Sequence, residues 1–223
     1  MNSKKKNIEA QIVEDFEKIR PAITRLLQTQ MKNDDLSLRY GRSKSNSKND
    51  IVINPSILVN TISKTNLDRD EVMIGTVVHE AIHATNNYSL DSESLNKLFP
   101  EELDDVQDID DVLEILTGPF GKYVFDILIH SIEEKIFVKQ YEGLNSILED
   151  IYTESFSEIK KLGNFSQYLS LLFHSITSYI DPEFENYKKP VVSSLNESLH
   201  ILKTLNYENV NISELIEATV QMV

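Results

Sequence analysis

The sequence predicts an α+β fold that is predominantly helical, with a helical C-terminal half and a small β-hairpin or sheet. Two observations support this prediction. Apolar residues recur at intervals of three and four through most of the chain, which is the spacing of an amphipathic helix. Only two short segments, 36–40 and 51–53, have the pattern of strands. With 223 residues and 40% hydrophobic content, the chain is long enough to bury a sizeable core.

The N-terminal region is expected to form a helix followed by two strands. Residues 8–31 carry apolar side chains at helical spacing, and Pro21 is expected to kink or break this helix. Segment 36–40 alternates as a strand does, and segment 51–53 is a second strand that ends at Asn54-Pro55. The polar residues between them predict a loop, so we expect the two strands to form a hairpin.

A second helix is expected to begin near Asp68. Asp68 suits the N-cap position, and Glu71 three residues later completes the pattern of a capping box. Asn86-Asn87 is a plausible end, because asparagine tolerates the left-handed conformation of a C-cap. The apolar face of this helix consists of Ile74, Val77, Val78, Ala81 and Ile82.

This helix carries an HExxH motif, formed by His79, Glu80 and His83. Two histidines four residues apart lie on the same helix face, so both can bind one metal ion. Glu80 projects beside that face, where its carboxylate can take a proton from a metal-bound water. Zinc would lower the pKa of that water to about 7, and Glu80 would act as general base for attack on a carbonyl. The alternative is that both histidines merely line a half-buried groove.

The rest of the chain is expected to be helical. A polar, acidic stretch follows residue 87, and Gly118-Pro119 interrupts the pattern. Residues 123–141 predict a long apolar helix, and residues 143–223 predict four or so further helices. We therefore divide the chain into a metal-binding domain, residues 1–142, and a helical extension, residues 143–223, packed on the same domain.

A tight catalytic zinc site needs a third protein ligand. The chain has no cysteine, so this ligand must be His, Asp or Glu. One candidate segment holds His130, Glu133 and Glu134 on the apolar helix, where a carboxylate is costly unless it is paired or binds a metal. Another holds Glu149. These four residues remain open as ligands, and the alternative is a polar stripe that faces solvent.

The motif followed by a glutamate on a later helix resembles the gluzincin group of zincin metallopeptidases. More narrowly, Ile132-Glu133-Glu134 is similar to a Glu-Asp helix in predicted metallopeptidase domains, some from phages or linked to von Willebrand A modules; this chain has Glu134 where those have Asp. The resemblance implies that His79, His83 and Glu133 bind Zn²⁺. Residues 51–87 are more weakly similar to SprT-type metallopeptidases, although the third histidine those enzymes use soon after the motif is missing here.

His174 lies on an apolar helix. The same resemblance implies a catalytic role for it, because a late histidine stabilises an oxyanion in some gluzincins. The alternative is a hydrogen-bonded histidine in the core. The strand at 51–53 is our candidate for pairing with an extended peptide substrate, as the strand before the active-site helix does in zincins.

Composition restricts the partners and the compartment. The net charge is −14, from 22 basic and 36 acidic residues, which argues against nucleic-acid binding. No stretch has the length of a membrane span, and the basic N-terminus is not followed by the apolar core of a signal peptide, so we expect a cytoplasmic protein without a membrane partner.

The sequence thus predicts a zinc-dependent metallopeptidase that hydrolyses peptide bonds in a protein or peptide substrate, with a metal-activated water and Glu80 as general base. The alternative is an acidic binding or inhibitor protein that has a zincin fold and little or no activity, used in phage or host interactions.

Overall fold

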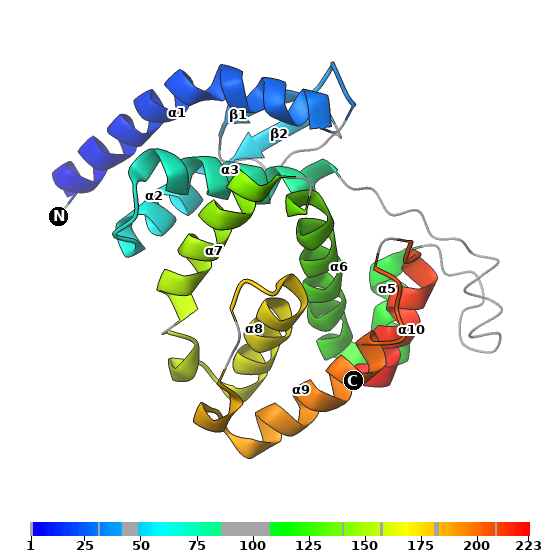
Figure 1. Ribbon diagram of the computed structural model, residues 1–223. Coiled ribbons are helices and arrows are strands. Elements are labelled where there is room, and N and C mark those ends of the chain that lie inside the picture. Colours follow the sequence, from blue (N-terminus) through cyan, green and yellow to red (C-terminus); the bar gives the residue numbers. More distant parts are fainter. Residues whose placement is uncertain are drawn as a thin grey trace. The chain divides into compact units, whose positions relative to one another are not determined.

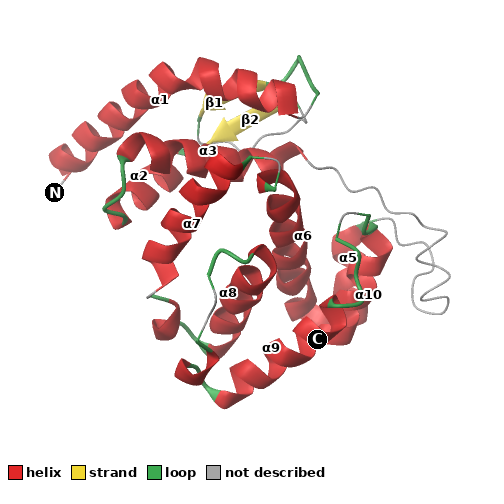
Figure 2. Cartoon of the chain, viewed as in Figure 1, coloured by secondary structure: helices red, strands yellow, loops and turns green. Residues whose placement is uncertain are grey.

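A computed structural model describes residues 2–30, 32–41, 49–85, 108–139, 141–156, 158–180, 183–207 and 209–223. Within these ranges helices dominate and two short strands form one sheet (Figures 1 and 2), so the predicted α+β, predominantly helical class is confirmed. The chain forms two compact units: Met1–Asn87 with Tyr141–Phe156, and Tyr88–Gln140 with Ser157–Val223. The division into two domains between residues 142 and 143 is not tested by these compact units, so it stays a prediction.

The first unit is built around one central helix, α3. This helix packs against α1, α2, β2 and α7, as Figure 1 shows. In chain order the unit comprises α1 (Asn2–Gln30), β1 (Ser37–Tyr40), β2 (Asp50–Ile53), α2 (Pro55–Lys64), α3 (Arg69–Thr85) and α7 (Glu142–Phe156). Its buried core draws on all of these elements and includes Ile12, Phe16, Leu38, Ile53, Leu58, Met73, Val77 and Leu148.

Helix α1 continues through Pro21, so the helix does not break there. A proline inside a helix removes one backbone hydrogen bond and strains the preceding turn. Phe16 lies before Pro21, Ile23 and Leu27 lie after it, and all three side chains are buried. Packing on both sides of Pro21 therefore keeps the segment in one helix.

The two strands pair in parallel, so the predicted hairpin is wrong. Ser37 lies opposite Asp50, and Tyr40 lies opposite Ile53. The connection at residues 41–49 can extend to roughly 30 Å, whereas a four-residue strand spans only about 13 Å. The connection is therefore long enough to return the chain to the start of β1, and the strand patterns alone do not specify the pairing direction.

Helix α2 was not predicted. The Asn54 side chain accepts a hydrogen bond from the backbone N–H of Ser56 at 2.9 Å, and Pro55 occupies the first turn. Asparagine at the N-cap followed by proline is a favourable helix start, because proline lacks the N–H that would be unsatisfied there. Asn54-Pro55 thus ends the strand, as predicted, and also begins the next helix.

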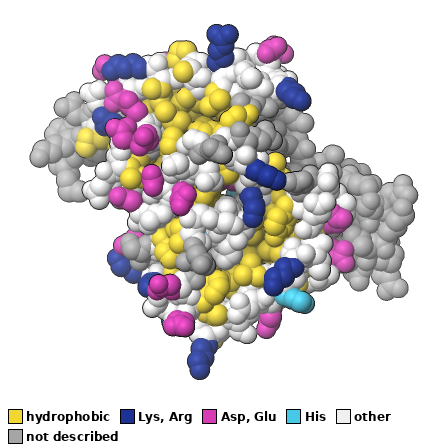
Figure 3. All heavy atoms as spheres, viewed as in Figure 1, with side chains coloured by type: hydrophobic (Ala, Val, Ile, Leu, Met, Phe, Trp, Pro, Cys, Tyr) yellow, Lys and Arg dark blue, Asp and Glu magenta, His cyan; other side chains and the backbone are white. Residues whose placement is uncertain are grey.

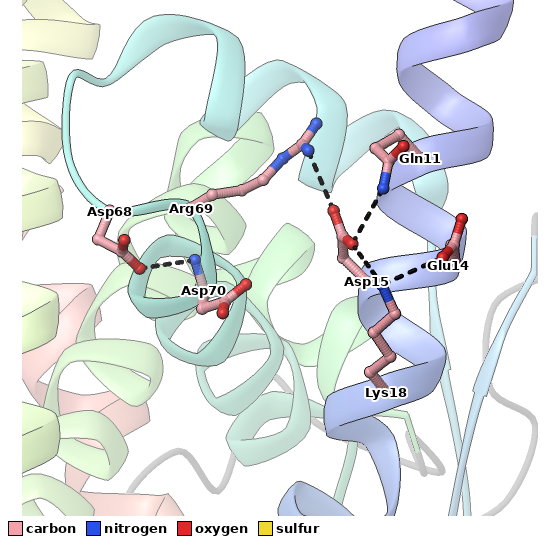
Figure 4. A network of polar contacts seen from close by, with 7 residues as sticks. All are labelled: Gln11, Glu14, Asp15, Lys18, Asp68, Arg69 and Asp70. Carbon is pink, nitrogen blue, oxygen red and sulfur yellow. Dashed lines mark hydrogen bonds and ion pairs between the residues drawn. The ribbon is translucent and has the colours of Figure 1, made fainter.

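Asp68 caps the start of α3, as predicted, and Arg69 ties this end of the helix to α1. Asp68 Oδ1 accepts hydrogen bonds from the backbone N–H groups of Asp70 at 2.9 Å and Glu71 at 3.3 Å. Figure 4 shows Arg69 reaching across to Asp15 of α1, with 3.0 Å between Nη1 and Oδ2. Asp15 also accepts from Gln11 Nε2 at 3.2 Å. Helix α3 is described as far as Thr85, and the predicted end at Asn86-Asn87 lies outside the described residues.

In the described part of the second unit, all of the regular secondary-structure elements are helices. Helix α6 packs against α5, α8 and α10, while α9 packs against α8 and α10. The elements are α5 (Ile109–Thr117), η1 (Gly118–Phe120), α6 (Gly121–Val138), η2 (Ile159–Lys161), α8 (Asn164–Thr177), η3 (Phe184–Asn186), α9 (Lys189–Leu202) and α10 (Ile212–Met222). The interruption at Gly118 is confirmed: its φ of 64° lies in the region that favours glycine, and a short 3₁₀ turn follows.

The surface drawn in Figure 3 has Lys and Arg side chains dispersed among acidic and apolar ones. Part of the acidic stretch that contributes to the net charge, residues 101–107, lies outside the described residues. Across the described part of the chain, no helix combines the length and the apolar character needed to cross a bilayer.

Candidate metal site

The HExxH motif lies on α3, as predicted. Helical geometry places His79 and His83 one turn apart on the same face. His79 and Glu80 are half-buried, and they stand between Val78 and Ala81, which are fully buried. The side chain of His83 lies outside the described residues. The structure therefore describes the helix backbone that carries both histidines, and the side chains of His79 and Glu80.

The imidazole of His79 is held by a tyrosine from α7. The Tyr152 hydroxyl oxygen lies 3.1 Å from Nδ1 of His79, and the two rings meet edge to face with their centroids 6.2 Å apart. A metal-binding histidine in proteins nearly always has its other ring nitrogen engaged in a hydrogen bond. With Nδ1 engaged by Tyr152, Nε2 is the nitrogen suited to bind a metal. The environment of His79 thus fits a metal ligand.

Gly75 allows α7 to approach α3 closely. A Cβ atom at position 75 would lie 2.7 Å from Ile151 Cδ1, 2.8 Å from Ile147 Cγ2 and 3.5 Å from Leu148 Cδ2. Carbon atoms in ordinary contact are about 3.5–4.0 Å apart. Gly75 precedes His79 by one helical turn, so the glycine lets the two helices meet next to the histidine.

The candidate third ligands lie in different parts of the chain. Glu149 is exposed on α7, whereas His130, Glu133 and Glu134 lie on α6 in the second unit. Glu133 is half-buried, and Glu134 is fully buried. Among the side chains that the structure describes, which do not include His83, no three His, Asp or Glu are grouped to hold a metal. Glu133 as the third ligand therefore stays a prediction.

His174 lies in the interior of the second unit, on α8. Its side chain is only 4% exposed, and the Glu134 carboxylate lies near enough to act on it electrostatically. Burial lowers the pKa of His174 to about 4, because the charged imidazolium loses its hydration, while Glu134 acts in the opposite direction. This environment favours the role of a neutral core histidine. The catalytic role for His174 stays a prediction.

Tyr152 is the residue that sequence reasoning missed. In this segment the sequence points to the carboxylate of Glu149 as a candidate ligand, yet Glu149 is exposed and Tyr152 reaches His79. The signal was present in the spacing: Leu148 and Tyr152 are four residues apart, so they share one helix face. That face packs against α3, which a search for carboxylates alone does not detect.

No protein-family model, curated protein or solved structure matches this chain. The resemblance to zincin metallopeptidases therefore rests on the motif residues themselves.

Proposed function

We propose that the chain is a zinc-dependent metallopeptidase in which His79, His83 and Glu133 hold the metal and Glu80 is the general base. The observation that carries this proposal is the HExxH motif on helix α3, with the first histidine held through Nδ1 by Tyr152. A helix supplies the spacing that two imidazoles need to bind one ion. The hydrogen bond supplies the fixed ring orientation that a metal ligand needs.

Zinc bound there would polarise the scissile carbonyl and acidify a water molecule. Glu80 accepts the proton that the attacking water loses and then donates it to the leaving amine. Its position immediately after His79 keeps the carboxylate at the edge of the metal-binding face, and its half-buried state leaves it partly open to substrate. Glu133 completes the three protein ligands that a catalytic zinc normally has.

Strand β2 supports a peptide as the substrate. It pairs with β1 on one side and packs directly against α3, with Ile51 and Ile53 buried. An extended peptide can add to a sheet through backbone hydrogen bonds. In the proposed enzyme, β2 aligns the substrate beside the helix that carries His79 and Glu80.

The proposal is tested by cleavage of a denatured protein with and without a metal chelator, using the wild type and Glu80→Gln. Glutamine cannot accept the proton, so hydrolysis should fall roughly 10²–10⁴-fold while bound zinc is retained. Glu71→Gln is the matched control, since Glu71 is exposed on the same helix; it should leave the rate unchanged. Activity of Glu80→Gln within about tenfold of the wild type would show that Glu80 is not the base.

A second candidate function is an acidic binding or inhibitor protein with a zincin fold. The observation that favours it is the net charge of −14. Such a protein would bind a basic surface, with an affinity that falls as salt screens the charges. Zinc-loaded wild-type protein that cleaves no member of a diverse peptide library would favour this candidate over the peptidase.

A further inference from the structure

The contact between Tyr152 and His79 raises the question of which ring nitrogen of His79 carries the hydrogen. The hydroxyl lies 3.1 Å from Nδ1, and the rings are inclined by 75° to one another. We propose that Tyr152 is a positioning residue that accepts the Nδ1–H of His79, so that the ring presents an unprotonated Nε2 to the metal. That Nε2 binds a metal rests on the proposed function. That His79 carries its hydrogen on Nδ1 does not.

A neutral imidazole carries its single N–H on one nitrogen or the other. With the hydrogen on Nε2, Tyr152 would donate to Nδ1 and the ligating nitrogen would be blocked. With the hydrogen on Nδ1, the Tyr152 oxygen accepts it and Nε2 carries no hydrogen. Only the second arrangement suits a histidine that binds a metal through Nε2.

The position of Tyr152 is fixed by the way α7 packs on α3. Gly75 allows Ile147 and Ile151 to approach the α3 backbone closely, as described above. A hydrogen bond also joins α7 to the segment before α3: the backbone N–H of Asn66 donates to Glu154 Oε2 at 2.8 Å. Glu154 follows Tyr152 by two residues. The tyrosine is therefore held between an apolar helix crossing and a hydrogen bond to the segment before α3.

The contact lies in a half-buried environment, since His79 and Tyr152 are both partly shielded from solvent. Water can replace a lost hydrogen-bond partner less readily there than on the surface. Loss of an outer partner of a metal ligand typically lowers metal affinity by roughly 10–100-fold. Removal of the Tyr152 hydroxyl should have an effect of this size.

The first arm of the test measures zinc affinity by competition with a chromophoric chelator. Tyr152→Phe should bind zinc roughly 10–100-fold more weakly than the wild type. Tyr207→Phe is the control: Tyr207 is a partly buried tyrosine of the second unit, with Lys135 Nζ 5.5 Å from its ring centre. It should bind zinc like the wild type. Equal zinc affinity of Tyr152→Phe and the wild type would overturn the inference.

The second arm needs neither zinc nor activity. Long-range ¹H–¹⁵N spectra of the metal-free protein show which nitrogen of His79 carries the hydrogen; His79→Gln assigns the signal. We expect a protonated Nδ1 in the wild type and a shift toward the other tautomer in Tyr152→Phe. A wild-type ring protonated on Nε2, or the same tautomer populations in both proteins, would overturn the inference. Failure of peptide cleavage alone would count against the proposed function and leave these spectra unaffected.

Discussion

Replacement of Gly75 by alanine tests whether α7 packs so closely on α3 that a side chain at position 75 destabilises the protein. The new Cβ would lie 2.7 Å from Ile151 Cδ1 and 2.8 Å from Ile147 Cγ2. These separations are roughly 0.7–1.3 Å shorter than ordinary carbon contacts, so side chains or helices must move. Overpacking of this kind costs about 1–3 kcal/mol. Alanine also favours the helix by about 1 kcal/mol relative to glycine, which offsets part of that cost.

Gly143→Ala separates the two effects. Gly143 lies in α7 and is exposed, and a Cβ there would have no neighbour within 4 Å. It gains the helix propensity without the overpacking. The protein with Gly75→Ala should therefore be less stable than the protein with Gly143→Ala by about 1–3 kcal/mol. Shortening Ile151 to valine removes the atom at 2.7 Å, so the cost of Gly75→Ala should be smaller in the Ile151→Val background.

Urea denaturation followed by circular dichroism measures these differences, provided that the dependence on urea is the same for all variants. Equal stabilisation by Gly75→Ala and Gly143→Ala would refute the helix crossing described here. It would also remove the structural reason for the position of Tyr152. If Gly75→Ala lowers the free energy of unfolding relative to Gly143→Ala, and Ile151→Val reduces that difference, both the helix crossing and the position of Tyr152 are supported.

The remaining predictions concern His174 and Glu80. The pKa of His174 is about 4 in the folded protein, against 6.5 for an ordinary histidine, so the unfolded chain takes up a proton first as the pH falls. The free energy of unfolding should therefore fall between pH 6.5 and about 4, by up to about 3 kcal/mol, with no further loss from this group below that range. Urea titrations at several pH values should show that the free energy of unfolding depends less on pH in His174→Gln than in the wild type. The same pH dependence in both proteins would contradict the lowered pKa of His174. Glu80→Gln should keep the zinc content of the wild type, because the proposal gives Glu80 a proton-transfer role and no metal bond; loss of zinc, measured by elemental analysis, would argue that it is a ligand.

Helical periodicity predicted much of this fold. The long helices α1, α3 and α6 each bury one apolar face, and the capping signal at Asp68 lies where α3 begins. The pairing direction of the strands could not be predicted, because the alternation of Leu36 to Tyr40 is compatible with parallel and antiparallel neighbours. Helix α2 is not among the predicted elements, because Asn54-Pro55 predicts the end of a strand, although the same two residues also suit a helix start.

The candidate site was predictable only where it is local in sequence. His79, Glu80 and His83 lie within two turns of one helix, so their spacing predicts their common face. Tyr152 is 73 residues from His79, and only tertiary packing brings the two together. A third metal ligand is equally hard to predict from sequence, because its distance from the histidines depends on how separate segments pack. Apolar surroundings alone do not distinguish Glu133 from its neighbours as the ligand.

In the proposed enzyme, His79 and His83 bind one catalytic zinc ion. The most direct test of this claim is the zinc content of purified wild type, His79→Ala and His83→Ala after equilibration with limiting free zinc. We expect one zinc per wild-type chain and no tight binding in either variant, with folding of all three verified by circular dichroism. Full zinc occupancy in either variant, or a wild type that binds no zinc, would contradict the claim.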